Sequence, residues 1–371
     1  MSEIYIGLMS GTSLDGVDGV LADFALATPR VIGHASLPLP PVVRSELLAL
    51  NSSGTDELHR AALAGNALVR VYAQVAARLL ADAGLPAAAV VAIGAHGQTV
   101  RHRPQEFDGT GSTLQLNQPA LLAELTGVDV VADFRSRDVA AGGQGAPLAP
   151  FFHQSLFAVP GRSVGVLNVG GISNVTLLRP DASMIGFDCG PGNALMDGWC
   201  QQHRGQDYDS EGSWAAGGSV LAPLLARLLA DPYFGRLPPK STGRDLFNRL
   251  WLDRQLTGFE AADPQDVQAT LTELTASACA GDIQRHEPGL QRLIVCGGGA
   301  LNTDLLRRLR ALLPGAAVDS SAKAGLPPLQ VEATAFAWLA RKTLRREKLA
   351  LESITGARGA RVLGCVYPAL S

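Results

Sequence analysis

A single carboxylate, Asp188, stands near the middle of the chain in a setting suited to acid–base chemistry. The apolar segment Met184–Phe187 predicts a short strand that ends at Asp188, and a helical pattern begins near Ala194. The glycine-rich turn Cys189–Asn193 lies between them. A carboxylate held between a strand end and a helix N-terminus could take a proton as a general base. The alternative is an Asp that only caps the helix, and the other motifs of the chain make us favour catalysis.

Two glycine-bearing hairpins could bind phosphate groups. In the first, strands predicted at Ile4–Met9 and Gly19–Phe24 flank a tip rich in Gly, Ser and Thr. In the second, the apolar runs Val164–Val169 and Ile172–Leu178 flank Gly170–Gly171. Backbone N–H groups at such tips can surround an anion. Taken alone, each hairpin could equally be a tight turn without a ligand.

Polar side chains that could bind a metal or a substrate occur near two of the predicted strands. Asp15 and Asp18, in the first tip, could hold a magnesium ion through water. His96 and Gln98 follow the buried strand predicted at Val90–Gly94 and could form hydrogen bonds to a polar substrate. A histidine buried in a turn or in the core is an equally good interpretation of His96.

Basic residues occur in two further loops. Arg135 and Arg137 could bind a carboxylate or a phosphate through paired hydrogen bonds, or they could form ion pairs with the neighbouring aspartates. Lys240 belongs to the loop 237–245, which gathers several anion-binding donors but lacks the Walker A pattern. This loop could contact a substrate or could be an exposed turn.

A third glycine cluster follows the buried strand predicted at Leu293–Cys296. Gly297, Gly298 and Gly299 precede a helix predicted from Asn302, and Asp319 lies at the usual distance for a dinucleotide-binding fingerprint. The third glycine of that fingerprint is absent, because Asn302 stands in its place. A backbone platform for an adenosine fits the cluster equally well.

Length and composition indicate a protein of two domains. The chain has 371 residues, with 47% hydrophobic and 18% charged residues and a formal net charge of −3. This charge gives no electrostatic reason to expect nucleic acid or an anionic membrane as a partner. Five scattered cysteines are expected to be reduced thiols. We find no signal-peptide pattern and no apolar run of membrane-spanning length, so the expected location is the cytoplasm.

The order of the elements indicates an internal repeat. Both hairpins have the same predicted order of strand, glycine-bearing tip and strand, and they lie about half a chain apart. A domain boundary is expected near residue 161. Two phosphate hairpins and a third glycine platform match the actin-like sugar kinase superfamily. Long helices are predicted at Val42–Leu50, Asp56–Ala83, 263–285 and Glu332–Leu344.

Eight motifs narrow this match, because together they resemble the anhydro-N-acetylmuramic acid kinase family. They run in order over nearly the whole chain. They are MSGTSLDGVD (9–18), AHGQTVRH (95–102), ADFRSRD (132–138), GGQGAPLAPFFH (142–153), NVGGISNVT (168–176), FDCGPGNALMD (187–197), PKSTGRDLFN (239–248) and CGGGALN (296–302).

The resemblance implies an α/β protein of two actin-like (ribonuclease H-like) domains, with an ATP and substrate cleft between them. The implied domains are residues 1–160, to which the C-terminal segment 331–371 returns, and residues 161–330. The implied activity uses ATP and Mg²⁺ to open 1,6-anhydro-N-acetylmuramic acid with water and to phosphorylate its O6. A homodimer is also implied.

The resemblance further assigns roles to residues. Asp188 is the implied catalytic base, and Asp15 and Asp18 are the metal candidates. The implied substrate contacts are His96, Gln98, Arg135, Asn193, Lys240 and Glu332. The implied nucleotide contacts are Gly11, Thr12, Ser13, Leu14, Asp15, Gly16, Val17, Asp18, Gly170, Gly171, Gly297, Gly298 and Gly299.

Two other functions remain open from the sequence. An NAD-dependent oxidoreductase could use the segment from Gly297 to Asp319, but this leaves the two hairpins unexplained. A catalytically silent sugar-binding regulator could share the kinase fold. The retained Asp188 and the lack of a basic helix-turn-helix pattern argue against a regulator.

Overall fold

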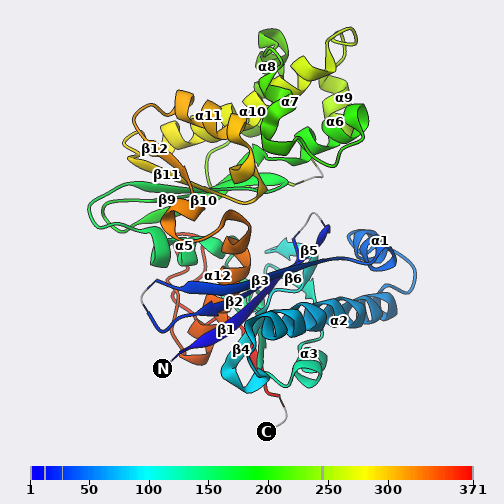
Figure 1. Cartoon of the computed structure of the whole chain (residues 1–371), viewed down its shortest axis with the longest axis vertical. Helices are drawn as coiled ribbons and strands as arrows, with labels where there is room; N and C mark the ends of the chain where they lie inside the picture. Colours follow the sequence, from blue (N-terminus) through cyan, green and yellow to red (C-terminus); the bar gives the residue numbers. More distant parts are fainter. Residues whose placement is uncertain (1, 12–13, 27, 244–245, 370–371) are drawn as a thin grey trace. The chain divides into compact units, whose positions relative to one another are not determined.

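The computed structural model describes residues 2–11, 14–26, 28–243 and 246–369. The chain forms two compact units, which are described separately below (Figure 1). Unit 1 comprises Met1–Phe152 together with Gln330–Ser371, and unit 2 comprises His153–Leu329. The C-terminal segment therefore belongs to the same unit as the N-terminus.

Unit 1 is built on a mixed sheet. The first three strands form an antiparallel meander, β4 pairs in parallel with β1, and β7 pairs in parallel with β4. β13 closes the edge antiparallel to β7. The strand order is β13-β7-β4-β1-β2-β3. The strands are β1 (Ile4–Met9), β2 (Gly16–Asp23), β3 (Arg30–Pro38), β4 (Val90–Ala95), β7 (Val130–Ala132) and β13 (Cys365–Tyr367).

Helices and a small hairpin complete unit 1. The long helix α2 (Glu57–Ala83) packs its apolar face against β2 and β3. The hairpin of β5 (Gln98–Pro104) and β6 (Gly111–Leu116) forms a separate two-stranded sheet. The other helices are α1 (Pro41–Ala49), α3 (Pro119–Thr126), α4 (Ser136–Ala140), α12 (Val331–Leu344) and α5 (Ala149–Phe157), which runs across the division between the units.

Unit 2 contains a five-stranded sheet with the order β10-β9-β8-β11-β12. Its first three strands are again antiparallel, and β11 and β12 add in parallel on the other side of β8. The long helix α10 (Pro264–His286) packs against β9 and β10. The strands are β8 (Val164–Val169), β9 (Ile172–Leu178), β10 (Met184–Pro191), β11 (Arg292–Cys296) and β12 (Ala317–Ser320). The other α-helices are α6 (Ala194–Arg204), α7 (Ser213–Ala216), α8 (Ala222–Leu229), α9 (Arg249–Gln255) and α11 (Thr303–Leu312).

The two units share one topology. In both sheets the first strand is central, two antiparallel strands follow on one side, and parallel strands follow on the other. The predicted repeat of hairpins at Ile4–Met9 and Val164–Val169 is therefore the start of a repeated domain. The predicted α/β fold class is confirmed.

Helix α12 approaches the sheet of unit 1 closely because two strand positions are glycines. A Cβ on Gly7 would lie 1.8 Å from the carbonyl oxygen of Ala333, and a Cβ on Gly94 would lie 2.1 Å from that of Phe336. No side chain fits at these two positions. These glycines allow the C-terminal helix to pack directly on β1 and β4.

Some elements differ from those predicted. Strands β3 and β5 were not predicted, β2 begins at Gly16 and not at Gly19, and β10 continues past Asp188 to Pro191. β3 is an edge strand with only one buried residue, Ala35, so its sequence carries no clear apolar alternation. β5 lies in a two-stranded sheet and buries only two of its residues, so its sequence also lacks a clear apolar pattern.

Two further features concern partners and redox state. No helix among the described residues is long and apolar enough to cross a membrane. All five cysteines are described, and none of them forms a disulfide bond, as predicted. Only Cys365 is exposed.

Candidate active site

Asp188 lies near the end of β10 in unit 2, where Asn174 of β9 is its strand partner. A register irregularity between Asp188 and Gly190 turns the chain at this point. The backbone N–H of Thr242 donates a hydrogen bond of 3.0 Å to Oδ2 of Asp188, and the hydroxyl of Tyr233 donates one of 2.8 Å to its carbonyl oxygen. These contacts fix both the backbone and the carboxylate of Asp188.

The surroundings of Asp188 weaken its acidity. Burial raises the pKa of its carboxyl to about 6, while the Thr242 N–H and the charge of Lys240 act in the opposite direction. A carboxylate with a pKa near 6 is ionised at neutral pH and is a stronger base than an exposed Asp. The hydroxyl Oγ1 of Thr242 is buried without a hydrogen-bond partner among the described residues, so it could bind water or substrate.

The predicted second hairpin is confirmed, with Val169 paired to Ser173 across the Gly170–Gly171 tip. The tip is tied to the turn that precedes α6. The N–H of Asn193 donates to the carbonyl of Gly170 at 2.7 Å, and that of Gly192 donates to the carbonyl of Gly171 at 2.9 Å. Backbone hydrogen bonds therefore join the glycine turn after Asp188 to the hairpin tip.

The third glycine cluster lies against this hairpin. Gly297 has φ +75°, and a Cβ there would lie 2.4 Å from Oδ1 of Asn168. A Cβ on Gly299 would lie 2.4 Å from Cγ1 of Val169. Only glycine allows the two segments to come this close, so unit 2 brings Gly170, Gly171 and Gly297–Gly299 together.

The backbone of this platform remains open to a ligand. At Gly170 an added Cβ would meet one atom within 4 Å, at 3.7 Å, and at Gly298 it would meet only Nδ2 of Asn193, at 3.3 Å. Such open glycine backbone fits the close approach of a nucleotide. Asn193 was predicted to contact the substrate. In the structure its Nδ2 donates to the carbonyl of Val169 at 3.1 Å, so Asn193 lies beside the glycine cluster.

The dinucleotide-binding alternative does not fit the local structure. A fingerprint glycine turn leads directly into its helix, whereas here Gly298 and Gly299 belong to a 3-10 turn, Gly298–Leu301, that ends before α11 begins at Thr303. Asp319, the expected ribose ligand, forms an ion pair of 2.7 Å with Lys323.

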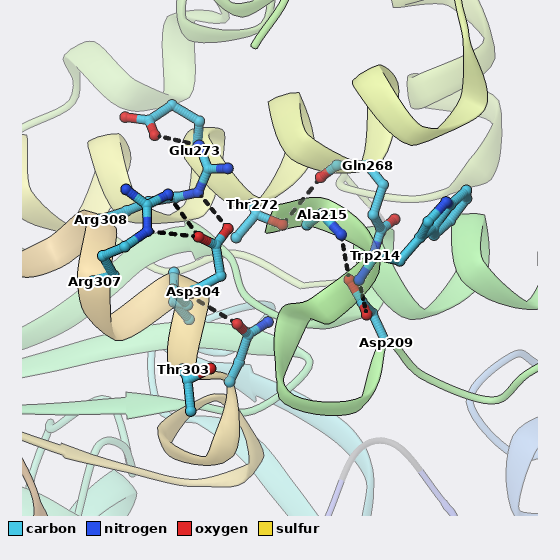
Figure 2. Close-up of polar contacts among 12 residues, drawn as sticks. Asp209, Trp214, Ala215, Gln268, Thr272, Glu273, Thr303, Asp304, Arg307 and Arg308 are labelled. Carbon is cyan, nitrogen blue, oxygen red and sulfur yellow. Dashed lines mark hydrogen bonds and ion pairs between the residues drawn. The ribbon is translucent and has the colours of Figure 1, made fainter. Parts of the chain in front are cut away.

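A polar network anchors α11 beside the glycine cluster (Figure 2). Asp304 accepts hydrogen bonds from Arg307 at 2.6 Å and from Arg308 at 2.7 Å, and Arg308 also donates to Glu273 of α10 at 2.8 Å. Asp209 accepts hydrogen bonds from the backbone N–H groups of Trp214 and Ala215 in α7, each at 2.9 Å. The contacts of Arg308 tie α11 to α10.

The first hairpin belongs to unit 1, with Met9 paired to Asp18. Thr12 and Ser13, predicted to contact phosphate, lie outside the described residues. At the described edge of the tip, the N–H of Leu14 donates to the carbonyl of Gly11 at 3.2 Å. The side chains of Leu14 and Val17 are buried, so neither is open to a ligand.

The two metal candidates have different surroundings. Asp15 is exposed and lies 3.7 Å from Arg44, whereas Asp18 lies 3.7 Å from His34 and affects the pKa of Glu332. Among the described residues, no three His, Cys, Asp or Glu side chains gather to hold a metal. Mg²⁺ in kinases is held by one or two carboxylates together with phosphate oxygens, so Asp15 or Asp18 fits such a role only beside a bound nucleotide.

Four predicted substrate residues gather in unit 1. Nε2 of His96 lies 3.1 Å from Nε and 2.9 Å from Nη2 of Arg135, and Nη1 of Arg135 donates to the carbonyl of Gly145 at 2.8 Å. The pKa of His96 is well below its usual value because of burial and the charge of Arg135, so His96 is neutral and accepts from the guanidinium. Gln98 is buried, and its Oε1 has no hydrogen-bond partner among the described residues.

Glu332, the fourth of these residues, lies in the first turn of α12. Loss of hydration and the charge of Asp18 raise the pKa of its carboxyl, whereas Arg135 lowers it. The side chain itself is exposed, so water screens these effects and we assign them no energy. Burial lowers the pKa of Arg135 to about 10, which leaves it positively charged at neutral pH.

Lys240 was predicted to contact the substrate. Its ammonium group is buried and lies 2.8 Å from Oδ2 of Asp282, so in this structure it forms an ion pair inside unit 2. Sequence reasoning did not identify Tyr233, Thr242 or Asp282 as site residues. Asp282 carried no clear signal in the sequence, because α10 is buried on most of its sides and shows no single apolar face.

Comparison with known proteins identifies the family. The family model "Anhydro-N-acetylmuramic acid kinase" matches residues 3–369. An anhydro-N-acetylmuramic acid kinase from Variovorax paradoxus is 65% identical over 99% of both chains, and one from Albidiferax ferrireducens is 62% identical over the full length of both. Among solved structures, an activator of 2-hydroxyisocaproyl-CoA dehydratase from Clostridium difficile matches with 12% identity and a TM-score of 0.48, covering 93% of this chain and 96% of that one. The chain belongs to the anhydro-N-acetylmuramic acid kinase family.

Proposed function

We propose that this protein uses ATP to open the anhydro ring of 1,6-anhydro-N-acetylmuramic acid with water and to phosphorylate O6. The products are N-acetylmuramic acid 6-phosphate and ADP, as expected for an enzyme of cell-wall recycling. The observation that carries this proposal is the match of the kinase family to residues 3–369, with relatives that are 62–65% identical over their whole length. Neither the oxidoreductase nor the silent regulator is supported by these relatives.

Asp188 is the general base of the proposed reaction. It takes a proton from water while the water oxygen bonds to C1 of the sugar and the C1–O6 bond breaks. O6 then receives the γ-phosphoryl group of ATP, so no separate acid is needed to protonate the leaving oxygen. A carboxylate with a pKa raised to about 6, held by the Thr242 N–H, suits this task.

The glycine elements are the proposed ATP site. ATP supplies the phosphoryl group, and the backbones at Gly11–Gly16, Gly170–Gly171 and Gly297–Gly299 would hold its phosphates and adenosine. The open backbone at Gly170 and Gly298 supports this assignment. We place Mg²⁺ beside Asp15 or Asp18 with the phosphate oxygens completing its coordination.

The cluster of unit 1 is the proposed sugar site. The guanidinium of Arg135 keeps its charge and is oriented by His96 and Gly145, so its remaining N–H groups could pair with the lactyl carboxylate of the substrate. Gln98 offers a buried carbonyl oxygen to a sugar hydroxyl or amide. Glu332 lies at the same site. We further propose a homodimer, as the family resemblance implies, and a cytoplasmic location, as the sequence patterns indicate.

The test is an assay of ADP release with three sugars. We expect turnover with 1,6-anhydro-N-acetylmuramic acid, and little or none with N-acetylmuramic acid or glucose. In ¹⁸O-labelled water the label should appear on C1 of the product and not on the phosphate. Label on the phosphate, or a preference for glucose, would contradict the proposal.

The role of Asp188 is tested by Asp188→Asn, which keeps the shape of the side chain and removes the base. Turnover should fall at least about 10²-fold with little change in substrate binding. Asp181→Asn, on the exposed turn between β9 and β10, is the matched control and should keep wild-type turnover. Near-normal turnover of Asp188→Asn would exclude this carboxylate as the base.

A further inference from the structure

A buried ion pair lies directly behind Asp188 in unit 2. Nζ of Lys240 is 3.0 Å from Oδ1 and 2.8 Å from Oδ2 of Asp282, and the two side chains are 1% and 3% exposed. The ammonium group also lies near the rings of Phe187 and Tyr233, with centroids 5.6 and 5.0 Å away. Lys240 therefore has a fixed position inside the protein.

The backbone on either side of Lys240 holds Asp188. The carbonyl of Lys240 accepts a hydrogen bond of 3.2 Å from the N–H of Asp188, and two residues later the N–H of Thr242 donates to the Asp188 carboxylate. Asp282, on α10, thus holds Lys240, and the segment around Lys240 holds both the backbone and the side chain of Asp188. Tyr233, which contacts the Lys240 ammonium group through its ring, also donates to the carbonyl of Asp188.

A purely structural role does not explain a charged pair at this place. A buried ion pair contributes little net stability, and apolar residues of similar volume often replace one without loss. Removing one partner alone leaves an unpaired buried charge. A charge beneath the base, in contrast, has a direct electrostatic effect on it, since Lys240 lowers the pKa of Asp188 against the effect of burial.

We propose that Lys240 and Asp282 are positioning residues for Asp188: the pair anchors the segment 239–242, which orients the carboxylate, and it places a compensated positive charge behind the base. This inference rests on the proposed function of Asp188. Lys240 accordingly acts through Asp188 and does not contact the sugar.

Other charged groups near the pair must be considered. Arg285 donates to Oδ1 of Asp282 at 3.0 Å but is half exposed, so solvent screens its charge. The ring of His286 packs against Phe187, and burial lowers its pKa, so it is neutral at pH 7. Burial raises the pKa of the Cys189 thiol and of the Tyr233 hydroxyl, so both are neutral as well. Lys240 is therefore the charge in this group that acts on Asp188, and Asp282 is the buried partner of that charge.

The experiment compares Lys240→Met with Asp282→Asn in the full-length enzyme. We measure kcat and KM as functions of pH, and we follow the titration of the Asp188 carboxyl without substrate by NMR of ¹³C-labelled aspartate, assigned with Asp188→Asn. Lys240→Met removes the positive charge, so the pKa of Asp188 should rise by about 1 unit. Asp282→Asn removes the compensating negative charge, so the pKa of Asp188 should fall. In both variants kcat should drop about tenfold or more while the KM for ATP stays nearly constant.

Glu273→Gln is the matched control, because Glu273 lies on α10 like Asp282, pairs with the buried Arg308 (Figure 2), and is not among the groups that shift the pKa of Asp188. It should leave the titration of Asp188 and kcat unchanged. The double variant Lys240→Met/Asp282→Leu replaces the pair by apolar side chains and covers the case in which a single variant does not fold. Its Asp188 should titrate higher than in the wild type.

The outcomes separate this inference from the proposed function. Opposite shifts of the Asp188 pKa in the two single variants support the positioning role. Shifts in the same direction, or none, would overturn it, because a loosened segment would remove the Thr242 hydrogen bond equally in both. The NMR titration needs no substrate. Opposite shifts in a protein that does not phosphorylate the anhydro sugar would therefore leave the electrostatic role of the pair standing and reject the kinase proposal alone.

Discussion

At the scale of single residues, the site depends on one carboxylate whose ionised form is costly to bury. Burial raises the pKa of Asp188 to about 6, and the N–H of Thr242 and the charge of Lys240 only partly offset this effect. The same burial that makes Asp188 a better base makes its ionised form less stable. Activity and stability should therefore depend on pH in opposite directions around this residue.

The activity of the enzyme should decrease as the pH falls through about 6. A general base acts only when it is unprotonated, so kcat/KM should decline about tenfold per pH unit below the pKa of Asp188. The profile of kcat/KM from pH 4.5 to 8 measures this limb. Asp181→Asn should show the same decrease of kcat/KM below about pH 6. A decrease that begins only near pH 4 in the wild type would contradict the raised pKa.

The substitution Asp188→Asn should reduce activity but make the folded protein more stable than the wild type at neutral pH. The pKa of Asp188 is higher in the folded protein than in the unfolded chain, so the folded state binds more protons between pH 3.8 and about 6. The stability that Asp188 contributes is therefore present at low pH and is lost as the pH rises through this window. Asn does not titrate, so Asp188→Asn should gain stability relative to the wild type as the pH rises from 4 to 7.

The expected gain has an upper limit of about 3 kcal/mol, and solvent screening reduces it because Asp188 is partly exposed. Urea unfolding at pH 4 and pH 7 measures the difference between the two proteins. A wild type that becomes more stable than Asp188→Asn as the pH rises would show that the pKa is lowered and not raised.

At the scale of elements, close backbone contacts through glycine decide how the helices and hairpins pack. Gly94 on β4 shows this most directly, because the carbonyl oxygen of Phe336 occupies the space of its missing side chain. Gly94→Ala should push α12 away from the sheet and lower the free energy of unfolding by about 1–3 kcal/mol. Equilibrium denaturation measures the loss.

The matched control for Gly94→Ala is Gly281→Ala on α10. An added Cβ on Gly281 meets no atom within 4 Å, and alanine favours the helix by about 1 kcal/mol over glycine. This variant should therefore be as stable as the wild type or more stable. If Gly94→Ala behaved like Gly281→Ala, then α12 would not be held against β4 as described.

The first hairpin should be required for nucleotide binding. Gly11→Val places a branched side chain at the tip, where a phosphate would approach the backbone. The affinity for ATP should fall about tenfold or more, which is about 1.4 kcal/mol per tenfold change. Isothermal titration with a non-hydrolysable ATP analogue measures it, and circular dichroism shows whether the variant is folded. A folded variant with unchanged affinity would remove this hairpin from the proposed site.

At the scale of the whole molecule, the proposed groups are divided between the two units. Asp188 and two of the glycine elements belong to unit 2, whereas the first hairpin, Arg135 and Glu332 belong to unit 1. If ATP and the sugar contact residues of both units when they bind, then the two units should close over them, as in other enzymes with two domains. X-ray scattering should show a smaller radius of gyration with an ATP analogue and the anhydro sugar together. Identical profiles with and without both ligands would argue against closure.

The sequence alone determined the α/β class, the repeated hairpin and the position of Asp188 near the end of a strand. These features follow from local patterns, because apolar runs such as Val164–Val169 and glycine tips such as Gly170–Gly171 specify a hairpin without reference to the rest of the chain. The family could also be identified from the sequence, since its motifs are contiguous. Edge strands such as β3 could not be predicted, because they bury too few side chains to produce an apolar pattern in the sequence.

Only the tertiary structure decided what the polar residues contact. Lys240, predicted to bind substrate, pairs with Asp282 some forty residues later in the chain, and Asn193 lies beside the glycine cluster. Gly7 and Gly94 gave no sign in the sequence that a helix from the end of the chain would cover them. Contacts between residues far apart in the chain depend on how strands and helices pack. Burial, which raises the pKa of Asp188, exists only once they have packed.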